Sequence, residues 1–313
     1  MTKRLAVLMG GLSAERAVSL VSGQAIASAL EGEGYDVTLI DAGMNLWEQL
    51  SSANPDVIIN ALHGEWGEDG RVQGVLDLYG KPYTHSGVMA SALAMDKHRS
   101  KAILHEAGIT VAEHKLMPRE LAAKSHAMAP PYVIKPNAQG SSVGIYLVKE
   151  DAKGPPQDIL ANEDMGANVM VEQYIGGREL TVTVMDGRAL CVTEIVPKTG
   201  WYDYEAKYSD GGSAHSLPAD IPLAATQLAL EWAALAHTAL GCRGVSRADF
   251  RYNDVKLKKN PSRDDIVNKM VMLEVNTQPG MTPTSLAPEQ AAHVGISFKA
   301  LCRWMVEDAS WPR

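Results

Sequence analysis

Residues 5–19 read LAVLMGGLSAERAVS and decide the fold of the first third of the chain. Five apolar residues, a pair of glycines and a run with helical spacing predict a strand, a tight turn and a helix that extends to about Leu30. Two further runs, DVTLI at 36–40 and DVIIN at 56–60, predict two more strands. Because strands that alternate with helices are typical of a parallel sheet, we expect an α/β fold here.

The remainder of the chain predicts hairpins rather than crossovers. A charged helix from Lys97 to Ala107, ended by Gly108, follows a domain boundary near 91–97. Two hairpins are expected, one over 132–148 and one over 179–196 with Asp186-Gly187 as its turn. The other expected elements are a strand at 168–174, a long loop at 200–216, a helix at 223–240, strands at 245–252 and 270–275, and an exposed insertion at 256–269.

Composition and charge exclude several classes of protein. The 313 residues normally divide into two or three domains, and a net charge of −8 without a basic block argues against a nucleic-acid partner. The apolar run at 5–9 is too short for a signal peptide, and no run approaches the roughly 20 apolar residues that span a membrane. Three scattered cysteines, without a C-x-x-C pair, supply neither a disulfide framework nor a thiolate zinc site. We expect a soluble cytoplasmic enzyme without membrane insertion.

Polar residues recur at a spacing of two on the last two predicted strands. Arg247 and Asp249 lie on one strand, and Glu274 and Asn276 on the next, so each pair shares a strand face. Two carboxylates and an amide oxygen suit a Mg²⁺ ion that also binds nucleotide phosphates. A salt bridge of Arg247 with Asp249 or Glu274 on a solvated sheet face explains the same spacing, and the spacing alone does not separate the two interpretations.

A lysine at a strand end precedes a flexible turn in the middle of the chain. Lys135-Pro136 is followed by QGSSVG at 139–144, whose backbone N–H groups could approach a phosphate closely. A plain glycine hairpin is the alternative. The P-loop pattern G-x-x-x-x-G-K-[ST] and the dinucleotide fingerprint G-x-G-x-x-G are both missing, which argues against a P-loop enzyme and a nicotinamide-dependent dehydrogenase.

Two motifs of the first third follow predicted strands, where an open parallel sheet binds its ligands. The run HGEWGEDG at 63–70 contains one histidine among short carboxylates, which favours a capped turn or a substrate contact over a metal site. Ser13 and Glu15 are typical of a helix N-terminal cap with acidic charge in the first turn. We expect both motifs to share one crevice.

In order and combination, these motifs resemble those of the D-alanine-D-alanine ligases, which are ATP-grasp enzymes. The resemblance covers almost the whole chain, and its matching stretches are 10–19, 62–70, 95–97, 135–144, 172–179, 205–208, 244–249 and 274–286. It implies three α/β domains: an N-terminal substrate domain with a parallel sheet at 1–95, a central ATP-grasp domain at 96–176 and a C-terminal catalytic ATP-grasp domain at 177–313.

The resemblance also implies an activity. The family joins two D-alanines for peptidoglycan synthesis: ATP phosphorylates the carboxylate of the first, and the amine of the second attacks the acylphosphate. ATP and two Mg²⁺ (or Mn²⁺) ions are then the cofactors, and participation of a monovalent cation stays open. The family commonly forms homodimers, so we expect one. A ligase that accepts D-serine or D-lactate and a nucleotide sensor that has kept the fold are the alternatives.

By the same resemblance, site residues receive roles. The metal ligands are Asp249, Glu274 and Asn276, and the nucleotide contacts are Lys97, Lys135, Glu172, the Ile175 backbone and Glu179. The substrate contacts are His63, Lys207, Ser285 and Leu286. Arg247 and the Gly280 N–H stabilise the oxyanion, and Glu15 holds the ammonium of the first D-alanine and forms a closing triad with Ser141 and Tyr208.

Two features of the sequence bear on how closely the chain follows that family. Tyr208 favours a dipeptide over a depsipeptide product, because relatives that make D-alanyl-D-lactate lack a tyrosine at this position. Asn137-Ala138-Gln139 stands where many relatives carry a charged residue, which could alter ATP affinity.

Overall fold

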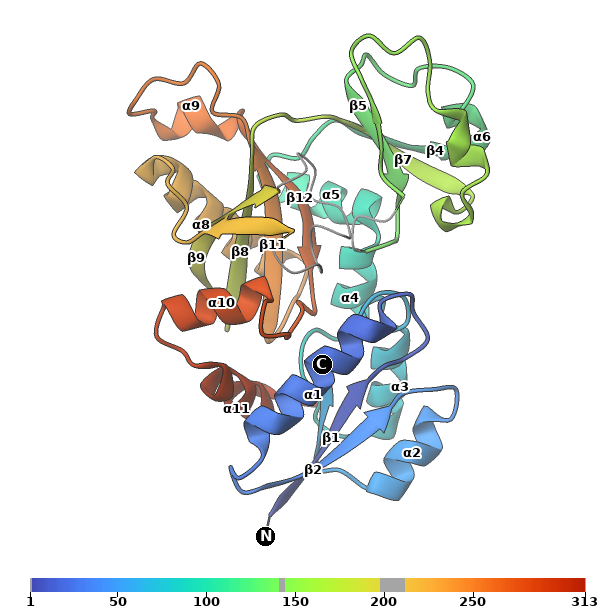
Figure 1. Ribbon diagram of the computed structural model, residues 1–313, viewed down its shortest axis with the longest axis vertical. Coiled ribbons are helices and arrows are strands. Elements are labelled where there is room, and N and C mark those ends of the chain that lie inside the picture. Colours follow the sequence, from blue (N-terminus) through green and yellow to red (C-terminus); the bar gives the residue numbers. More distant parts are fainter. Residues whose placement is uncertain (1, 141–143, 198–211, 313) are drawn as a thin grey trace.

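The computed structural model describes residues 2–140, 144–197 and 212–312, and these residues form three sheets with helices around them. In Figure 1 the N-terminal sheet lies at the bottom, the sheet of the middle segment at the upper right and the C-terminal sheet at the upper left. The predicted mixture of a parallel N-terminal sheet with later hairpins is confirmed.

The N-terminal sheet has the order β2-β1-β3 and is parallel. Its strands are β1 (Lys3–Met9), β2 (Tyr35–Asp41) and β3 (Val57–Asn60), and its neighbouring helices are α1 (Arg16–Leu30), α2 (Leu46–Ala53) and α3 (Arg71–Tyr79). All three predicted strands and the predicted helix are present. The C-terminal helix α11 (Phe298–Asp308) returns to this sheet and shares a core with β1 and α1, which brings the end of the chain back to its beginning.

The middle segment forms a four-stranded antiparallel sheet of order β4-β7-β5-β6. The strands are β4 (His114–Pro118), β5 (Tyr132–Pro136), β6 (Tyr146–Val148) and β7 (Asn168–Gln173), with α6 (Arg119–Ala122) and the 3₁₀ turns η1 (Gln157–Leu160) and η2 (Glu163–Met165) beside them. The predicted hairpin is confirmed by the antiparallel pairing of β5 with β6. Every residue of β5 is buried, so Lys135 reaches its partners from inside the protein.

The C-terminal sheet has five antiparallel strands in the order β10-β9-β8-β11-β12. These are β8 (Arg178–Met185), β9 (Arg188–Pro197), β10 (Ser213–Ser216), β11 (Val245–Tyr252) and β12 (Met270–Asn276). Helices α4 (Val88–Met95), α5 (Lys97–Glu106) and α8 (Leu223–Ala239) contribute to its core, and α10 (Leu286–His293) follows β12. The domain boundaries at 95/96 and 176/177 stay a prediction.

Two expectations need correction in this part of the chain. The end of the predicted loop at 200–216 is the edge strand β10, because its backbone pairs with β9 in spite of its polar composition; residues 198–211 lie outside the described ranges. The insertion at 256–269 is exposed at all four of its lysines, as expected, but contains α9 (Arg263–Val267), which a capping box of Ser262 and Asp265 starts. Ile266 of this helix is buried in the core of the C-terminal sheet.

We find, in the described part of the chain, no helix with the length and apolar character needed to cross a membrane.

Candidate functional site

A pocket opens where the loop after β12 meets the loops after β1 and β3. It is lined by Glu15, His63, Glu68, Gly140, Arg247, Asn276, Gln278, Pro279, Gly280, Thr282, Thr284, Ser285 and Leu286. Residues from both ends of the sequence therefore meet at one place, and many of them are predicted site residues. The expectation that the two N-terminal motifs share a crevice is confirmed.

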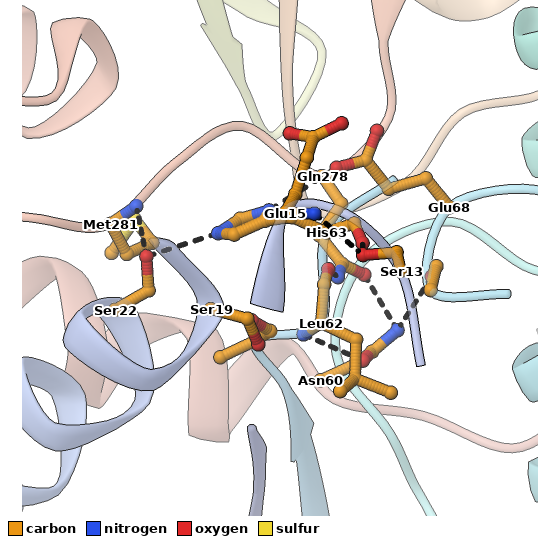
Figure 2. Close-up of polar contacts among 12 residues, drawn as sticks. Ser13, Glu15, Ser19, Ser22, Asn60, Leu62, His63, Glu68, Gln278 and Met281 are labelled. Atoms are coloured by element: carbon orange, nitrogen blue, oxygen red, sulfur yellow. Dashed lines mark hydrogen bonds and ion pairs between the residues drawn. The ribbon is translucent and has the colours of Figure 1, made fainter. Parts of the chain in front are cut away.

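The imidazole of His63 is held on both sides inside this pocket (Figure 2). Its Nδ1 lies 3.2 Å from the Glu68 carboxylate and its Nε2 lies 3.0 Å from Ser22 Oγ, while the side chain is only 4% exposed. The Ser13 hydroxyl donates to the His63 carbonyl at 2.6 Å. The ring is thus fixed by a carboxylate and a hydroxyl, and Ser22 and Glu68 were not among the predicted site residues.

The sequence suggests Ser13 as the cap of helix α1 and Glu15 as acidic charge in its first turn, but Glu15 itself occupies the N-cap position. Helix α1 starts at Arg16, has no acidic residue in its first turn and receives no side-chain cap from Glu15. The Glu15 carboxylate instead packs between two glycines: a Cβ on Gly64 would lie 2.8 Å from Oε1, and a Cβ on Gly140 would lie 2.9 Å from it. The Ser13 hydroxyl accepts from the Glu15 N–H in the turn before α1 and donates to the His63 carbonyl. The prediction of Ser13 as cap and Glu15 in the first turn is therefore wrong in register, because α1 begins only after Glu15, and the Glu15 carboxylate packs against the two glycines.

The predicted face of β11 and β12 is observed, with Arg247 opposite Asn276 and Asp249 opposite Glu274. Arg247 donates to both Asp249 oxygens, from Nε at 2.9 Å and from Nη2 at 2.8 Å. Thr181 of β8 and Asn276 donate to the same carboxylate at 2.6 and 3.0 Å. The ion pair offered as the alternative is therefore real, but it lies along one strand and is largely buried rather than on a solvated face.

The donor set on these strands fits a divalent metal that is shared with phosphates. Glu274 lies 3.2 Å from Lys97 Nζ, beside Asp249 and Asn276. In the described ranges no three His, Cys, Asp or Glu side chains are grouped so that they could hold a metal by themselves. Mg²⁺ is commonly held by one or two carboxylates and completed by substrate phosphates and water. Two carboxylates and one amide oxygen match that pattern.

The two predicted phosphate lysines contact the turn after β5 and strand β7. Lys97 Nζ donates to the Gln139 carbonyl at 2.6 Å, and Lys135 Nζ donates to Glu172 at 2.7 Å. The backbone carbonyl of Asn137 accepts from the Lys97 amide, and the Asn137 side chain donates to Asp96 at the start of α5. This residue therefore fixes the backbone around Lys97.

Lys101 completes a buried cluster that the sequence reasoning missed. Its Nζ lies 2.7 Å from Glu172, on the oxygen opposite the one that Lys135 contacts, and it donates to the Met272 carbonyl. Burial alone would raise the pKa of Glu172, but the two ammonium groups outweigh burial and lower that pKa to about 2. Lys101 follows Lys97 by four residues on α5, so both lie on one helix face, and that spacing could have identified it.

Arg251 organises the connection between β7 and β8, and it too was missed. Its Nε donates to the Ile175 carbonyl at 3.0 Å, its Nη2 to the Gly177 carbonyl at 2.8 Å, and its Nη1 lies 3.1 Å from Glu179. Arg251 continues the alternation of Arg247 and Asp249 along β11. The spacing of two that relates Arg247 to Asp249 leads next to Arg251, so the sequence pattern could have identified this residue.

The loop after β12 presents backbone and hydroxyl groups to the pocket. Helix α10 starts at Leu286, and the amides of a helix's first turn have no carbonyl partner within the helix, which suits them to bind a carboxylate. Ser285 Oγ accepts from the Thr282 amide at 2.9 Å. A Cβ on Gly280 would lie 2.8 Å from this hydroxyl, so the close approach requires glycine. Ser141, Lys207 and Tyr208 lie outside the described residues.

The three sheets, the Lys97–Glu274 and Lys101–Glu172–Lys135 ion pairs and the arginine beside Asp249 are the features of an ATP-grasp ligase. Residues 41–86 match the family described as "D-ala D-ala ligase N-terminus", and residues 103–307 match "D-ala D-ala ligase C-terminus". The chain belongs to the D-alanine-D-alanine ligase family.

Individual relatives agree with this assignment over at least 93% of their own length. A D-alanine-D-alanine ligase of Ruegeria sp. strain TM1040 is 56% identical over 99% of this chain and 97% of its own, and one of Caulobacter vibrioides is 57% identical over 98% and 93%. Among solved structures, the Bacillus anthracis D-alanine-D-alanine ligase complexed with ATP has a TM-score of 0.76 at 27% identity and covers 98% of this chain and 97% of its own. The VanG D-Ala:D-Ser ligase of Enterococcus faecalis has a TM-score of 0.76 at 28% identity, with 98% and 99% covered. The predicted family, fold and ligase class are confirmed.

Proposed function

We propose that this enzyme joins two D-alanine molecules to D-alanyl-D-alanine for peptidoglycan synthesis and converts one ATP to ADP and phosphate. The family assignment supports this activity, together with the use of ATP and a divalent metal. The observation that carries it is one pocket in which Glu15, His63, Arg247 and Gly280 converge. Asn276 of its lining donates to Asp249, and Glu274 on the same strand pairs with Lys97.

In the first step, a carboxylate oxygen of the first D-alanine attacks the γ-phosphorus of ATP, and ADP leaves. Two anions must approach each other, and we assign the neutralisation of phosphate charge to Lys97 and Lys135, whose ammonium groups lie at the turn after β5 and at β7. Asp249, Glu274 and Asn276 would hold Mg²⁺, which when bound offsets the negative charge of the triphosphate. Glu15 anchors the ammonium of the first D-alanine, and His63 lies at its carboxyl end.

In the second step, the amine of the second D-alanine attacks the acyl carbon, the C–O bond to the phosphorus-bound oxygen breaks, and phosphate leaves with the oxygen that came from the carboxylate and with the proton that the amine gives up. Negative charge develops on the carbonyl oxygen, where Arg247 and the Gly280 N–H donate hydrogen bonds. Ser285 and the Leu286 amide receive the second carboxylate, since they lie at the N-terminus of α10.

The base and ribose bind along the connection between β7 and β8. The Ile175 carbonyl already accepts from Arg251, so its N–H is the group left for the base, and Glu179 receives the ribose. Both Glu172 oxygens contact lysines, so its carboxylate acts on the nucleotide through Lys135. The use of Mn²⁺ or a monovalent cation, a homodimer and a cytoplasmic location stay predictions.

The second substrate is D-alanine rather than D-lactate, a prediction that rests on Tyr208. The closing triad of Glu15, Ser141 and Tyr208 and the contact made by Lys207 likewise stay predictions, because three of these residues lie outside the described ranges. Competition between D-alanine and D-lactate at neutral pH, followed by mass analysis, tests the selectivity. Comparable yields of dipeptide and depsipeptide would contradict it.

Isotope transfer tests the two-step chemistry. D-Alanine labelled with ¹⁸O in both carboxylate oxygens is turned over with Mg²⁺ and unlabelled ATP, and the released phosphate is analysed by mass. Each phosphate should carry one ¹⁸O atom, because the carboxylate oxygen becomes the bridging oxygen of the acylphosphate. Unlabelled phosphate, or label that enters only from ¹⁸O-water, would overturn the mechanism.

A further inference from the structure

The loop after β12 is tied to the N-terminal sheet through the buried side chain of Gln278. This amide is 2% exposed, and its Oε1 accepts from Asn60 Nδ2 at 2.6 Å. Its Nε2 donates to the carbonyl of Leu62, the residue before His63 (Figure 2). Both polar atoms of a residue in the C-terminal loop are thus satisfied by groups of the N-terminal segment.

Asn60 shapes the N-terminal half of the pocket from the end of β3. Its side chain is fully buried, its Oδ1 accepts from the Leu62 amide at 3.2 Å, and its Nδ2 also donates to the Gly67 carbonyl at 3.2 Å. The two ends of the loop that carries His63 are therefore joined through Asn60. The same Asn60 Nδ2 that donates to Gly67 also donates to Gln278, so Asn60 links this loop to the loop after β12.

A second tie lies on the other side of Gly280. The Met281 amide donates to Ser22 Oγ at 3.3 Å, and Ser22 Oγ lies 3.0 Å from His63 Nε2. Gly280 stands between the two tied residues 278 and 281. The position of its N–H relative to the His63 ring is consequently set by one contact before it and one contact after it.

We propose that Gln278 is a positioning residue for the ligase reaction, with Asn60 as its partner: it aligns the Gly280 side of the substrate pocket with the His63 side. The proposal rests on the proposed function, in which the first D-alanine lies between these two groups. The partners are 218 residues apart in sequence, so no local structure holds them together. Misplacement of reacting groups by about 1 Å costs up to about a hundredfold in rate, which makes such an alignment consequential.

Gln278→Leu removes both hydrogen bonds at nearly constant volume, and Gln73→Leu is the matched control. Gln73 is equally buried and donates to the same Gly67 carbonyl at 2.8 Å, but its contact stays within the N-terminal segment. We expect Gln278→Leu to lower kcat/KM for D-alanine at least about tenfold while the Kd of ATP changes less than about twofold. Gln73→Leu should leave kcat/KM for D-alanine within about threefold.

A double-variant cycle separates alignment from general stability. Asn60→Ala and Gln278→Ala should together lower kcat/KM for D-alanine by less than the product of their separate effects, because each breaks the same contact. If Gln278→Leu does not fold, Gln278→Asn, which keeps the amide but shortens its reach, should show the same loss. Thermal melting curves accompany every variant.

Three results would overturn the proposal: equal losses in the Gln278 and Gln73 variants, a lower melting temperature of Gln278→Leu with unchanged kcat/KM, or multiplicative effects in the cycle. The wild-type enzyme is assayed first with D-alanine. Absence of turnover there would refute the proposed function, whereas an active wild type with an equally active Gln278→Leu variant would refute the positioning role alone.

Discussion

Replacing Arg251 with methionine should weaken ATP binding and leave the KM of D-alanine unchanged. The substitution keeps an apolar stem and removes the guanidinium that holds the carbonyls of Ile175 and Gly177 and the carboxylate of Glu179. These groups belong to the connection that receives the base and ribose in the proposed function. Without Arg251, ATP itself has to order this connection on binding.

The size of the effect follows from the number of residues released. Residues 175–177 are fixed from one side by Arg251, while β7 and β8 still hold the ends of the connection. If one to two of these residues become mobile, ordering them again costs about 1.5 to 3 kcal/mol, at a mid-range value of about 1.5 kcal/mol per residue. Because about 1.4 kcal/mol corresponds to a tenfold change, the Kd of ATP should rise about tenfold to a hundredfold.

Calorimetric titration with a non-hydrolysable ATP analogue and Mg²⁺ measures this Kd, and steady-state kinetics at saturating ATP measure the KM of D-alanine. Arg178→Met is the matched control: Arg178 also pairs with a carboxylate, Glu194, and donates to a backbone carbonyl, that of Asp220, but on the other side of the sheet. A Kd within about twofold of the wild-type value in Arg251→Met, or an equal rise in Arg178→Met, would refute the reasoning.

Three further predictions concern the metal strands and a buried histidine. Arg247→Ala should lower kcat about 10²-fold or more through loss of an oxyanion donor, and near-normal kcat would show that its role is misassigned. Asp249→Asn should raise the Mg²⁺ concentration for half-maximal activity at least about tenfold, and an unchanged Mg²⁺ titration would remove it from the metal ligands. Burial lowers the pKa of His237, so its contribution to stability is complete above the unfolded value of about 6.5 and is lost as pH falls from there toward the folded pKa. The melting temperature of the wild type should therefore fall more steeply between about pH 7 and 5 than that of His237→Gln, whereas equal slopes would contradict the shift.

The sequence was most informative where polar residues alternate along a strand, because residues two apart lie on the same face of the sheet. Alternation along β11 placed Arg247 and Asp249 together, and the antiparallel partner strand supplied Glu274 and Asn276 in register. The same period includes Arg251, which was overlooked because its partners are backbone carbonyls of another connection. Sequence patterns show which side chains share a face but do not show which carbonyls that face will meet.

Contacts between distant segments could not be predicted in this way. Ser13 and Glu15 have the local signature of a helix cap, yet His63 and two glycines determine where they lie. The Lys101–Glu172 ion pair joins a helix to a strand of another sheet, and nothing in the spacing of these two residues indicates it. Local propensity is a weak guide wherever a long-range contact competes with it.

The central claim, D-alanine-dependent ligation, is tested most directly by phosphate release from the purified enzyme with Mg²⁺ and ATP. The assay is run with D-alanine, with L-alanine and without amino acid, and the product is identified by mass. We predict phosphate release that requires D-alanine and yields D-alanyl-D-alanine in equal amount. Release that stays at the ATP-only level with D-alanine, or equals that with L-alanine, would contradict the account.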